Sequence, residues 1–184
     1  MNNMFTYVAL LRGINVGGHH KVSMAELSKE MINLGFANVV TILNSGNIIF
    51  DAPVDQEELV EVTISEHLEK VLGFSVPVLI RKKEEFLDLL QNNPFRNAEI
   101  TEDTRLYVSF LKEVANIGLE LPWTSPDGSF LISEVRGRAV YTVLNLALNK
   151  TAKAMEVLEH LFGKDITTRN WNTIERIAVK ITSQ

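Results

Sequence analysis

The residue types best suited to holding an anion are concentrated in three short stretches of this chain, residues 11–18, 44–47 and 167–173. Their arginines and asparagines offer hydrogen-bond donors in fixed geometry for phosphate, carboxylate or amide groups. Their glycines allow a backbone to approach a ligand closely. These stretches therefore predict a site for a small anionic or nucleotide-like ligand.

The candidate ligand-binding residues stand at the ends of apolar segments, where strands and helices meet loops. They are Arg12, Asn15, Gly17, Gly18, Ser45, Asn47, Arg169 and Asn170. Ser45 lacks the G-x-S-x-G surroundings of a nucleophile elbow and has no assigned base. The sequence thus identifies no catalytic residue and no cofactor, and the question of an enzyme stays open.

Each stretch also has a structural interpretation. Residues 12–21 join a strand to a helix N-terminus, which can hold an anion, but their glycines match neither the dinucleotide nor the P-loop spacing. The alternative is a structural turn with Arg12 paired to a carboxylate. Residues 44–47 can be a turn with self-satisfied asparagines. Arg169 is either a buried anchor or an anion contact facing the first loop.

Cysteine and histidine usage limits the possible chemistry. The absence of cysteine excludes disulfides, thiol nucleophiles and thiolate metal sites. His19 and His20 are adjacent, so their side chains point in different directions, while His67 and His160 lie on separate predicted helices. We therefore predict no metal site.

Composition and charge restrict the partners. The chain has 184 residues, 46% of them hydrophobic, and a formal net charge of -5. That charge disfavours non-specific binding around a polyanion such as nucleic acid, because such binding requires many lysine and arginine side chains. We find no apolar run of membrane-spanning length and no signal peptide, so we expect a cytoplasmic protein without a membrane partner. Its oligomeric state is not predicted.

The first half alternates strands and helices in an orderly way. Residues 5–11 form a predicted strand, and a helix begins after Ser23, with Glu26 completing a capping box. Strands at 39–43 and 48–50 follow as a hairpin, and a second helix ends at Gly73 before a strand at 76–80. This order is the split βαβ, or ferredoxin-like, arrangement.

The pattern begins again after a connecting helix at 82–91. The expected second-half elements are a strand at 106–111, a short helix around 112–119, a hairpin of strands at 130–135 and 140–144, a helix ending at Gly163, a strand at 166–168 and a last helix from Trp171. We predict an α+β fold of two packed ferredoxin-like (split βαβ) subdomains with an additional C-terminal helix. The boundaries are 1–81, a connection at 82–103, and 104–184. The relation between the halves rests on element order.

Residues 9–18, 41–47 and 167–173 resemble a bacterial family known as a domain of unknown function, DUF 1697. The resemblance implies paired α+β subdomains of ferredoxin-like character and no established reaction. This chain matches the family at Arg12 and Arg169. This chain departs from the family in having His19-His20 after the double glycine, Ile42 and Asn44 in place of Tyr and Gln, and residues 146–153 in place of a basic segment.

Three classes of function follow from these observations. The first is ligand binding in a cleft lined by Arg12, Asn15, the Gly17-Gly18 backbone, Asn47 and Arg169. The second is a protein or RNA interaction module that uses a sheet face or edge, although the few aromatic residues lie in apolar runs that indicate burial. The third is an enzyme acting on a phosphorylated or acylated metabolite.

Overall fold

The computed structural model describes residues 3–17, 20–115 and 118–183 and has a mixed α+β architecture. The described residues form two antiparallel sheets and five helices, the last of them C-terminal. Two compact units divide the chain, one comprising Met1–Asp88 with Arg176–Gln184, the other Leu89–Glu175. Within the described ranges, no helix has the length and apolar character needed to cross a membrane.

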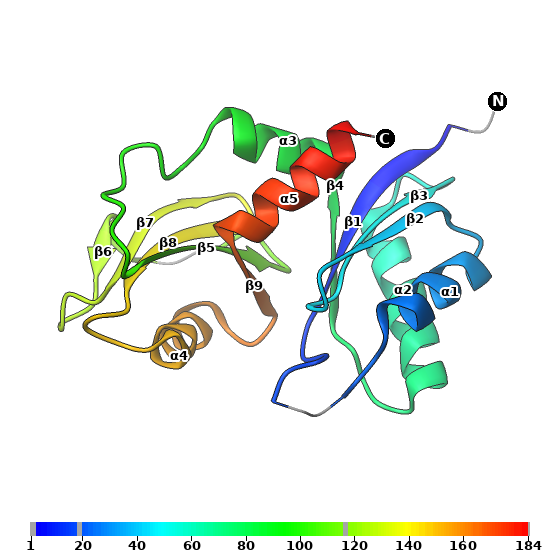
Figure 1. Cartoon of the computed structure of the whole chain (residues 1–184), viewed down its shortest axis with the longest axis horizontal. Coiled ribbons are helices and arrows are strands. Elements are labelled where there is room, and N and C mark those ends of the chain that lie inside the picture. The colour runs from blue at the N-terminus through cyan, green and yellow to red at the C-terminus, as the bar shows by residue number, and fades with distance from the viewer. Residues whose placement is uncertain (1–2, 18–19, 116–117, 184) are drawn as a thin grey trace. The chain divides into compact units, whose positions relative to one another are not determined.

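The first unit has the predicted split βαβ order (Figure 1). Its sheet is ordered β2-β3-β1-β4, with every neighbouring pair antiparallel. The connecting helix α3 follows. The elements are β1 (Phe5–Leu11), α1 (Met24–Asn33), β2 (Ala37–Ile42), β3 (Asn47–Ala52), α2 (Glu57–Leu72), β4 (Val78–Lys82) and α3 (Lys83–Gln91).

Local sequence signals explain where α1 begins and where α2 ends. The hydroxyl oxygen of Ser23 accepts a hydrogen bond from the backbone N–H of Glu26 at 3.1 Å, which confirms the predicted N-cap of α1. Gly73 ends α2 with a φ of 77°, a left-handed conformation that favours glycine.

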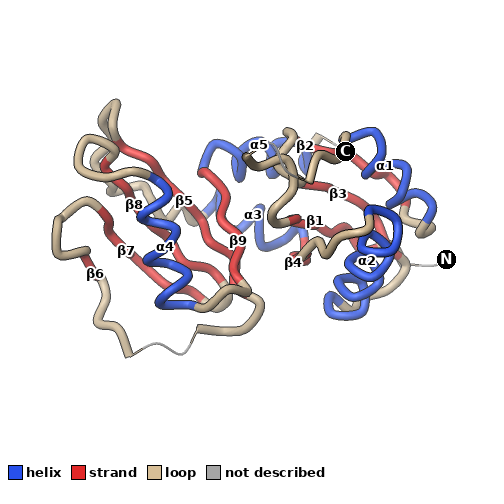
Figure 2. Tube along the Cα trace, turned by 90° about the horizontal axis from the view of Figure 1, so that it is seen from below, coloured by secondary structure: helices blue, strands red, loops and turns tan. Residues whose placement is uncertain are grey.

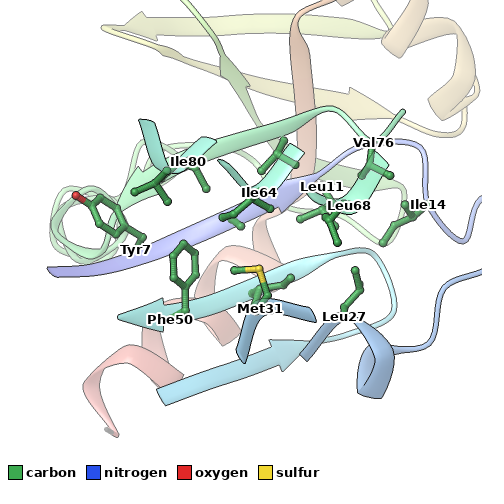
Figure 3. Packing of buried hydrophobic residues seen from close by; sticks show 14 of the residues in the cluster. Tyr7, Leu11, Ile14, Leu27, Met31, Phe50, Ile64, Leu68, Val76 and Ile80 are labelled. Carbon is green, nitrogen blue, oxygen red and sulfur yellow. The ribbon is translucent and has the colours of Figure 1, made fainter. Parts of the chain in front are cut away.

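The core of the first unit lies between α1, α2 and one face of the sheet (Figure 3). Tyr7 and Phe50 come from the strands, Met31 from α1, and Ile64 from α2, and all are fully buried. The opposite face of the sheet is also buried, as the full burial of Val8 shows. Both faces of the two central strands, β1 and β3, are therefore largely excluded from solvent, whereas β2 is more exposed.

The second unit has a sheet ordered β6-β7-β8-β5-β9 (Figure 2), with α4 packed on one face. Apart from the short β6, this is the strand order of the first sheet. Helix α5 follows β9 directly. The elements are β5 (Thr104–Leu111), β6 (Trp123–Thr124), β7 (Phe130–Arg136), β8 (Ala139–Asn145), α4 (Thr151–Phe162), β9 (Ile166–Asn170) and α5 (Trp171–Thr182).

The prediction of a short helix around residues 112–119 is wrong. Residues 112–115 and 118–119 are not helical. The backbone N–H of Lys112 donates to the carbonyl oxygen of Asp165 at 3.1 Å, so a contact distant in sequence takes up a backbone group at the point where the helix was expected to begin. Ala115 and Leu119 pack against the second core from an irregular segment. This half thus lacks a counterpart of α1 among the described residues.

The two units repeat each other at the level of individual hydrogen bonds. The N–H of Leu11 donates to Gly46 at 2.8 Å, and that of Leu111 donates to Arg138 at 2.9 Å. The next residue donates to the segment before the last strand in both halves, from Arg12 to Pro77 and from Lys112 to Asp165. The sequences Thr-Tyr-Val-Ala-Leu-Leu-Arg (6–12) and Leu-Tyr-Val-Ser-Phe-Leu-Lys (106–112) therefore correspond position by position.

The same correspondence pairs the two buried arginines of the last strands. Arg81 of β4 lies opposite Val8 of β1, and Arg169 of β9 lies opposite Val108 of β5. Both arginines are buried. Arg169 is thus the structural counterpart of Arg81.

Gly46 is the most closely packed of the described glycines. Its φ is 75°, and a Cβ atom there would lie 2.8 Å from both Leu11 Cβ and Ile14 Cδ1. We expect Gly46→Ala to destabilise the first unit by about 2–4 kcal/mol, because left-handed strain adds to overpacking. Urea unfolding followed by far-ultraviolet circular dichroism measures this.

Gly73→Ala is the matched control for that substitution. Gly73 has a φ of 77° but no heavy atom within 4 Å of the added Cβ. Its cost should be limited to the conformational part, about 1–2 kcal/mol. Equal destabilisation by the two alanine variants would contradict the close packing of Gly46.

Asp127 organises the turn that precedes β7. Its Oδ1 accepts hydrogen bonds from the hydroxyls of Ser125 and Ser129 at 2.6 and 2.8 Å and from the Ser129 N–H, while Oδ2 accepts one from Asn149. These donors, that of Ser125 foremost, hold the pKa of the Asp127 carboxyl well below its usual range.

A carboxyl group whose pKa is lower in the folded than in the unfolded protein stabilises the folded state at pH values above the unfolded-state pKa. This contribution is lost as the pH falls through the folded-state pKa. We therefore expect Asp127→Ala to lower the urea midpoint near neutral pH, with the difference from wild type narrowing as the pH falls below about 4. Both tryptophans, Trp123 and Trp171, belong to this unit, so their fluorescence reports its unfolding. A difference independent of pH would contradict the role of the ionised carboxylate.

Candidate functional site

The predicted ligand-binding residues divide between the two units. Arg12, Asn15, Gly17, Ser45 and Asn47 belong to the first unit. Arg169 and Asn170 belong to the second unit, in β9, and Gly18 lies outside the described residues. A cleft shared by Arg12 and Arg169 remains a prediction, because the two residues lie in different units.

Asn15 holds the loop that follows β1. Its Nδ2 donates to the carbonyl oxygens of Val22 and Asn44, both at 2.9 Å, and its Oδ1 accepts from the Val22 N–H at 2.9 Å. Its φ of 56° lies in the left-handed region, which asparagine tolerates better than most residues. Because these bonds occupy the amide, Asn15 positions the loop.

Asn47 and Ser45 fix the turn between β2 and β3. Asn47 is fully buried, and its Nδ2 donates to the Ile42 carbonyl at 2.9 Å and to the Ser45 hydroxyl at 3.0 Å. These contacts support the interpretation of residues 44–47 as a turn with internally bonded side chains.

Arg12 and the neighbouring glycines shape the same loop. Arg12 is half-buried, and its backbone N–H donates to the Pro77 carbonyl at 2.9 Å. Gly17 has a φ of 61° and open space where a Cβ would lie. Ile14 anchors the loop at the end of the core, next to Leu11 and Val76 (Figure 3).

Arg169 and Asn170 make local contacts at the start of α5. Arg169 Nη1 donates to the Thr167 hydroxyl at 2.8 Å and to the Thr168 carbonyl at 3.0 Å. Burial lowers the pKa of the guanidinium to about 10, so the group stays charged at neutral pH. Asn170 Oδ1 accepts from the Asn172 N–H at 3.0 Å, so this side chain caps the N-terminus of α5.

A hollow of about 560 Å³ lies where the first loop, the start of α1 and the β2–β3 turn meet. We call it the α1 hollow. It is lined by Asn15, Lys21, Val22, Ser23, Met24 and Asn44. Of these, only Asn15 belongs to the predicted site. Lys21 is outside the three stretches rich in arginine, asparagine and glycine, so residue type did not predict it, although a lysine two residues before the N-cap Ser23 is a signal that the sequence contains.

The start of α1 gives the α1 hollow donors for an anion. Within the described part of the chain, the backbone N–H groups of Met24 and Ala25 have no hydrogen-bond partner, as is usual in a first helical turn. Lys21 is exposed and forms no ion pair within that same part. The positive end of the helix dipole adds to this charge, while Glu26 in the first turn opposes it.

The second sheet does not provide the exposed aromatic platform used by sheet-face RNA-binding domains. Tyr141 and Trp171 are buried and pack around Phe95, with ring centroids 6.1 and 5.3 Å from it. Phe110 of β5 is buried too. Base stacking requires exposed rings, so these aromatics serve packing.

The histidine and carboxylate side chains of the described residues are not clustered as metal ligands would be. No group of three or more histidine, aspartate or glutamate side chains is arranged there to hold a metal ion. The ring nitrogen of His67 instead contacts Glu30 at 2.8 Å and links α2 to α1.

Comparison with known proteins places the chain in a family. A solved structure described as conserved bacterial protein SP0830 from Streptococcus pneumoniae superposes with a TM-score of 0.74 at 26% identity, covering 98% of this chain and 99% of that one. No curated protein sequence matches significantly. Neither the neighbour nor the matching family carries an assigned function. The family model matches residues 4–120, and the chain belongs to the family described as protein of unknown function (DUF1697).

Proposed function

We propose that the chain binds a small anionic ligand in the α1 hollow. The observation that carries this proposal is that Lys21 and the start of α1 border one hollow of about 560 Å³. Small-molecule sites commonly have volumes of about 300–1,000 Å³, so the hollow suits an organic ligand of nucleotide size or smaller.

The anionic group is held by Lys21 and by the N–H groups of Met24 and Ala25. A helix N-terminus that follows a loop from a strand is a recurrent anion-binding arrangement. The Ser23 hydroxyl oxygen accepts from the Glu26 N–H, which leaves its own proton available to a ligand. The side-chain amide of Asn44, which makes no hydrogen bond within the described residues, offers a further polar contact.

The loop is organised before any ligand arrives. Asn15 makes three hydrogen bonds that join the loop to Val22 and Asn44. A site that is already ordered loses less conformational entropy on binding, so more of the contact energy contributes to affinity. In this proposal Asn15 is a positioning residue, and Arg169 makes no contact with the ligand.

We assign no reaction to the hollow. Nucleophilic catalysis requires a nucleophile within hydrogen-bond reach of a base. The Ser23 hydroxyl accepts its hydrogen bond from the backbone N–H of Glu26, and no carboxylate or imidazole of the described residues lines the hollow. Binding is therefore the function that these residues support best.

Lys21→Ala tests the proposal. For any of inorganic phosphate, glycerol phosphate and AMP that binds the wild type, titration calorimetry should show a Kd at least tenfold higher for the variant. A hydrogen bond to a charged group contributes about 1.5–3 kcal/mol, which corresponds to about 10–150-fold.

Lys29→Ala is the matched control, since Lys29 is exposed on the same helix and does not line the hollow. It should leave the Kd unchanged. Saturable binding by none of the three anions, or equal weakening by both alanine variants, would argue against the site.

A further inference from the structure

We infer that the second unit binds a small aromatic amine, a flat ring that carries a positive charge, at the C-terminal end of α4. A hollow of about 280 Å³ lies there, lined by residues 111–115 at the end of β5 and by residues 161–165 between α4 and β9. We call it the α4 hollow. Its volume is just below the range of about 300–1,000 Å³ that is common for small-molecule sites, so it suits a molecule built on a single ring.

The internal repeat shows how the first unit fills the corresponding position. The matching hydrogen bonds at the ends of β1 and β5 make Val114 the counterpart of Ile14. Ile14 is 2% exposed and packs in the first core. Val114, in contrast, is 67% exposed and lines the α4 hollow. The second unit therefore leaves open a position that the first unit closes with an apolar side chain.

A second pair of counterparts shows the same difference. Val76 and Lys164 each precede the residue whose carbonyl oxygen accepts a hydrogen bond from the central strand, Pro77 in one unit and Asp165 in the other. Val76 is 1% exposed and lies beside Ile14 in the first core (Figure 3). Lys164 is exposed and lines the α4 hollow. At these two positions the second unit does not seal the end of its core.

The apolar part of the α4 hollow is the uncovered end of that core. Leu111 is buried, and Leu161 and Phe162 are half-buried and pack against the second core cluster. All three residues line the hollow. An apolar group placed against them would leave water and would also cover core side chains, which favours its binding.

The first unit also indicates the shape of the occupant. Phe74 is the third residue before Pro77, as Phe162 is the third before Asp165. The imidazole ring of His20 stacks on Phe74, with ring centroids 4.1 Å apart and the planes 8° from parallel. Among the described residues, no ring contacts Phe162. A flat ring therefore fits against Phe162 as His20 fits against Phe74.

The charges around the α4 hollow favour a cation. The side-chain carboxylates of Glu113 and Asp165 line it and form no ion pair or hydrogen bond within the described part of the chain. The carbonyl oxygens of the last two residues of α4 accept no hydrogen bond there either, and a helix C-terminus carries partial negative charge. Lys112 and Lys164 also line the hollow, but each already has an interaction partner. The negative groups are thus the ones left for a ligand.

Four small molecules test the inference by amide NMR titration of the full chain. Phenethylamine, protonated at neutral pH, combines the ring with the charge. Ethylamine carries the charge alone, phenylethanol the ring alone, and phenylacetate the ring with a negative charge. We expect phenethylamine to shift the signals of residues 112–115 and 161–165 saturably. It should bind at least tenfold more tightly than ethylamine, because a buried ring adds a large apolar area, and at least threefold more tightly than phenylethanol, because exposed ion pairs contribute less.

Two substitutions separate the apolar contact from the charge. Val114→Asn removes an exposed apolar side chain from the hollow, so we expect it to weaken phenethylamine binding at least threefold. Leu148→Asn is the matched control, because Leu148 is 59% exposed in the same unit and does not line the hollow. It should leave the Kd unchanged. The double variant Glu113→Gln, Asp165→Asn keeps the shape of both side chains and should bind phenethylamine no more tightly than phenylethanol.

Several results would overturn the inference. They are the absence of saturable shifts at residues 112–115 and 161–165, equal affinity for phenethylamine and phenylacetate, equal weakening by Val114→Asn and Leu148→Asn, and unchanged binding by the double variant. The inference is independent of the proposed anion site, since Lys21 belongs to the first unit and does not line the α4 hollow. Failure of the α1 hollow to bind phosphate or AMP would therefore leave these outcomes unaffected.

Discussion

At the end of β1, the backbone of Gly46 approaches the side chains of Leu11 and Ile14 more closely than any residue with a Cβ atom could. A hydrogen bond of 2.8 Å from the Leu11 N–H to the Gly46 carbonyl holds the two backbones at this short distance. Ile14 is thereby held in the core, and the loop after β1 returns across the β2–β3 turn. Asn15 then joins the loop to Asn44. The α1 hollow thus depends on a packing constraint before it depends on any charged group.

The two halves share the way the central strand ends and differ in the segment that follows it. Leu111 and Lys112 reproduce the hydrogen bonds of Leu11 and Arg12, so both central strands end with the same pair of backbone hydrogen bonds. The segments that follow the two strands differ. The first continues through an ordered turn into α1, whereas residues 112–115 and 118–122 form no helix. Helix-terminal donors are therefore present only after the first of the two strands, among the described residues.

Signals that act over a few residues made most elements predictable. The capping hydroxyl of Ser23, the left-handed Gly73 and the hairpin turn at residues 44–47 all determine backbone geometry locally. The irregular course after β5 was not predictable in this way. Its apolar spacing fits a helix, and the competing bond from Lys112 to Asp165 joins residues distant in sequence.

The candidate site was predictable in part for a related reason. Residue type indicated the loop that borders the α1 hollow, because asparagine and glycine accept left-handed conformations that a tight loop needs. It did not separate residues that shape a site from residues that face a ligand. Asn47 and Arg169 have strong donors, yet these are directed at neighbouring protein groups. The equivalence of Arg169 with Arg81 becomes visible only from strand register.

The charge of the whole chain limits how the hollow can select a ligand. A formal net charge of -5 gives no general attraction for anions, and Glu26 places a carboxylate on the first turn of α1. Attraction of an anion to the proposed site must then come from short-range contacts with Lys21 and the first N–H groups of the helix. Such contacts recognise any small anion alike, so discrimination among anions requires a second kind of contact.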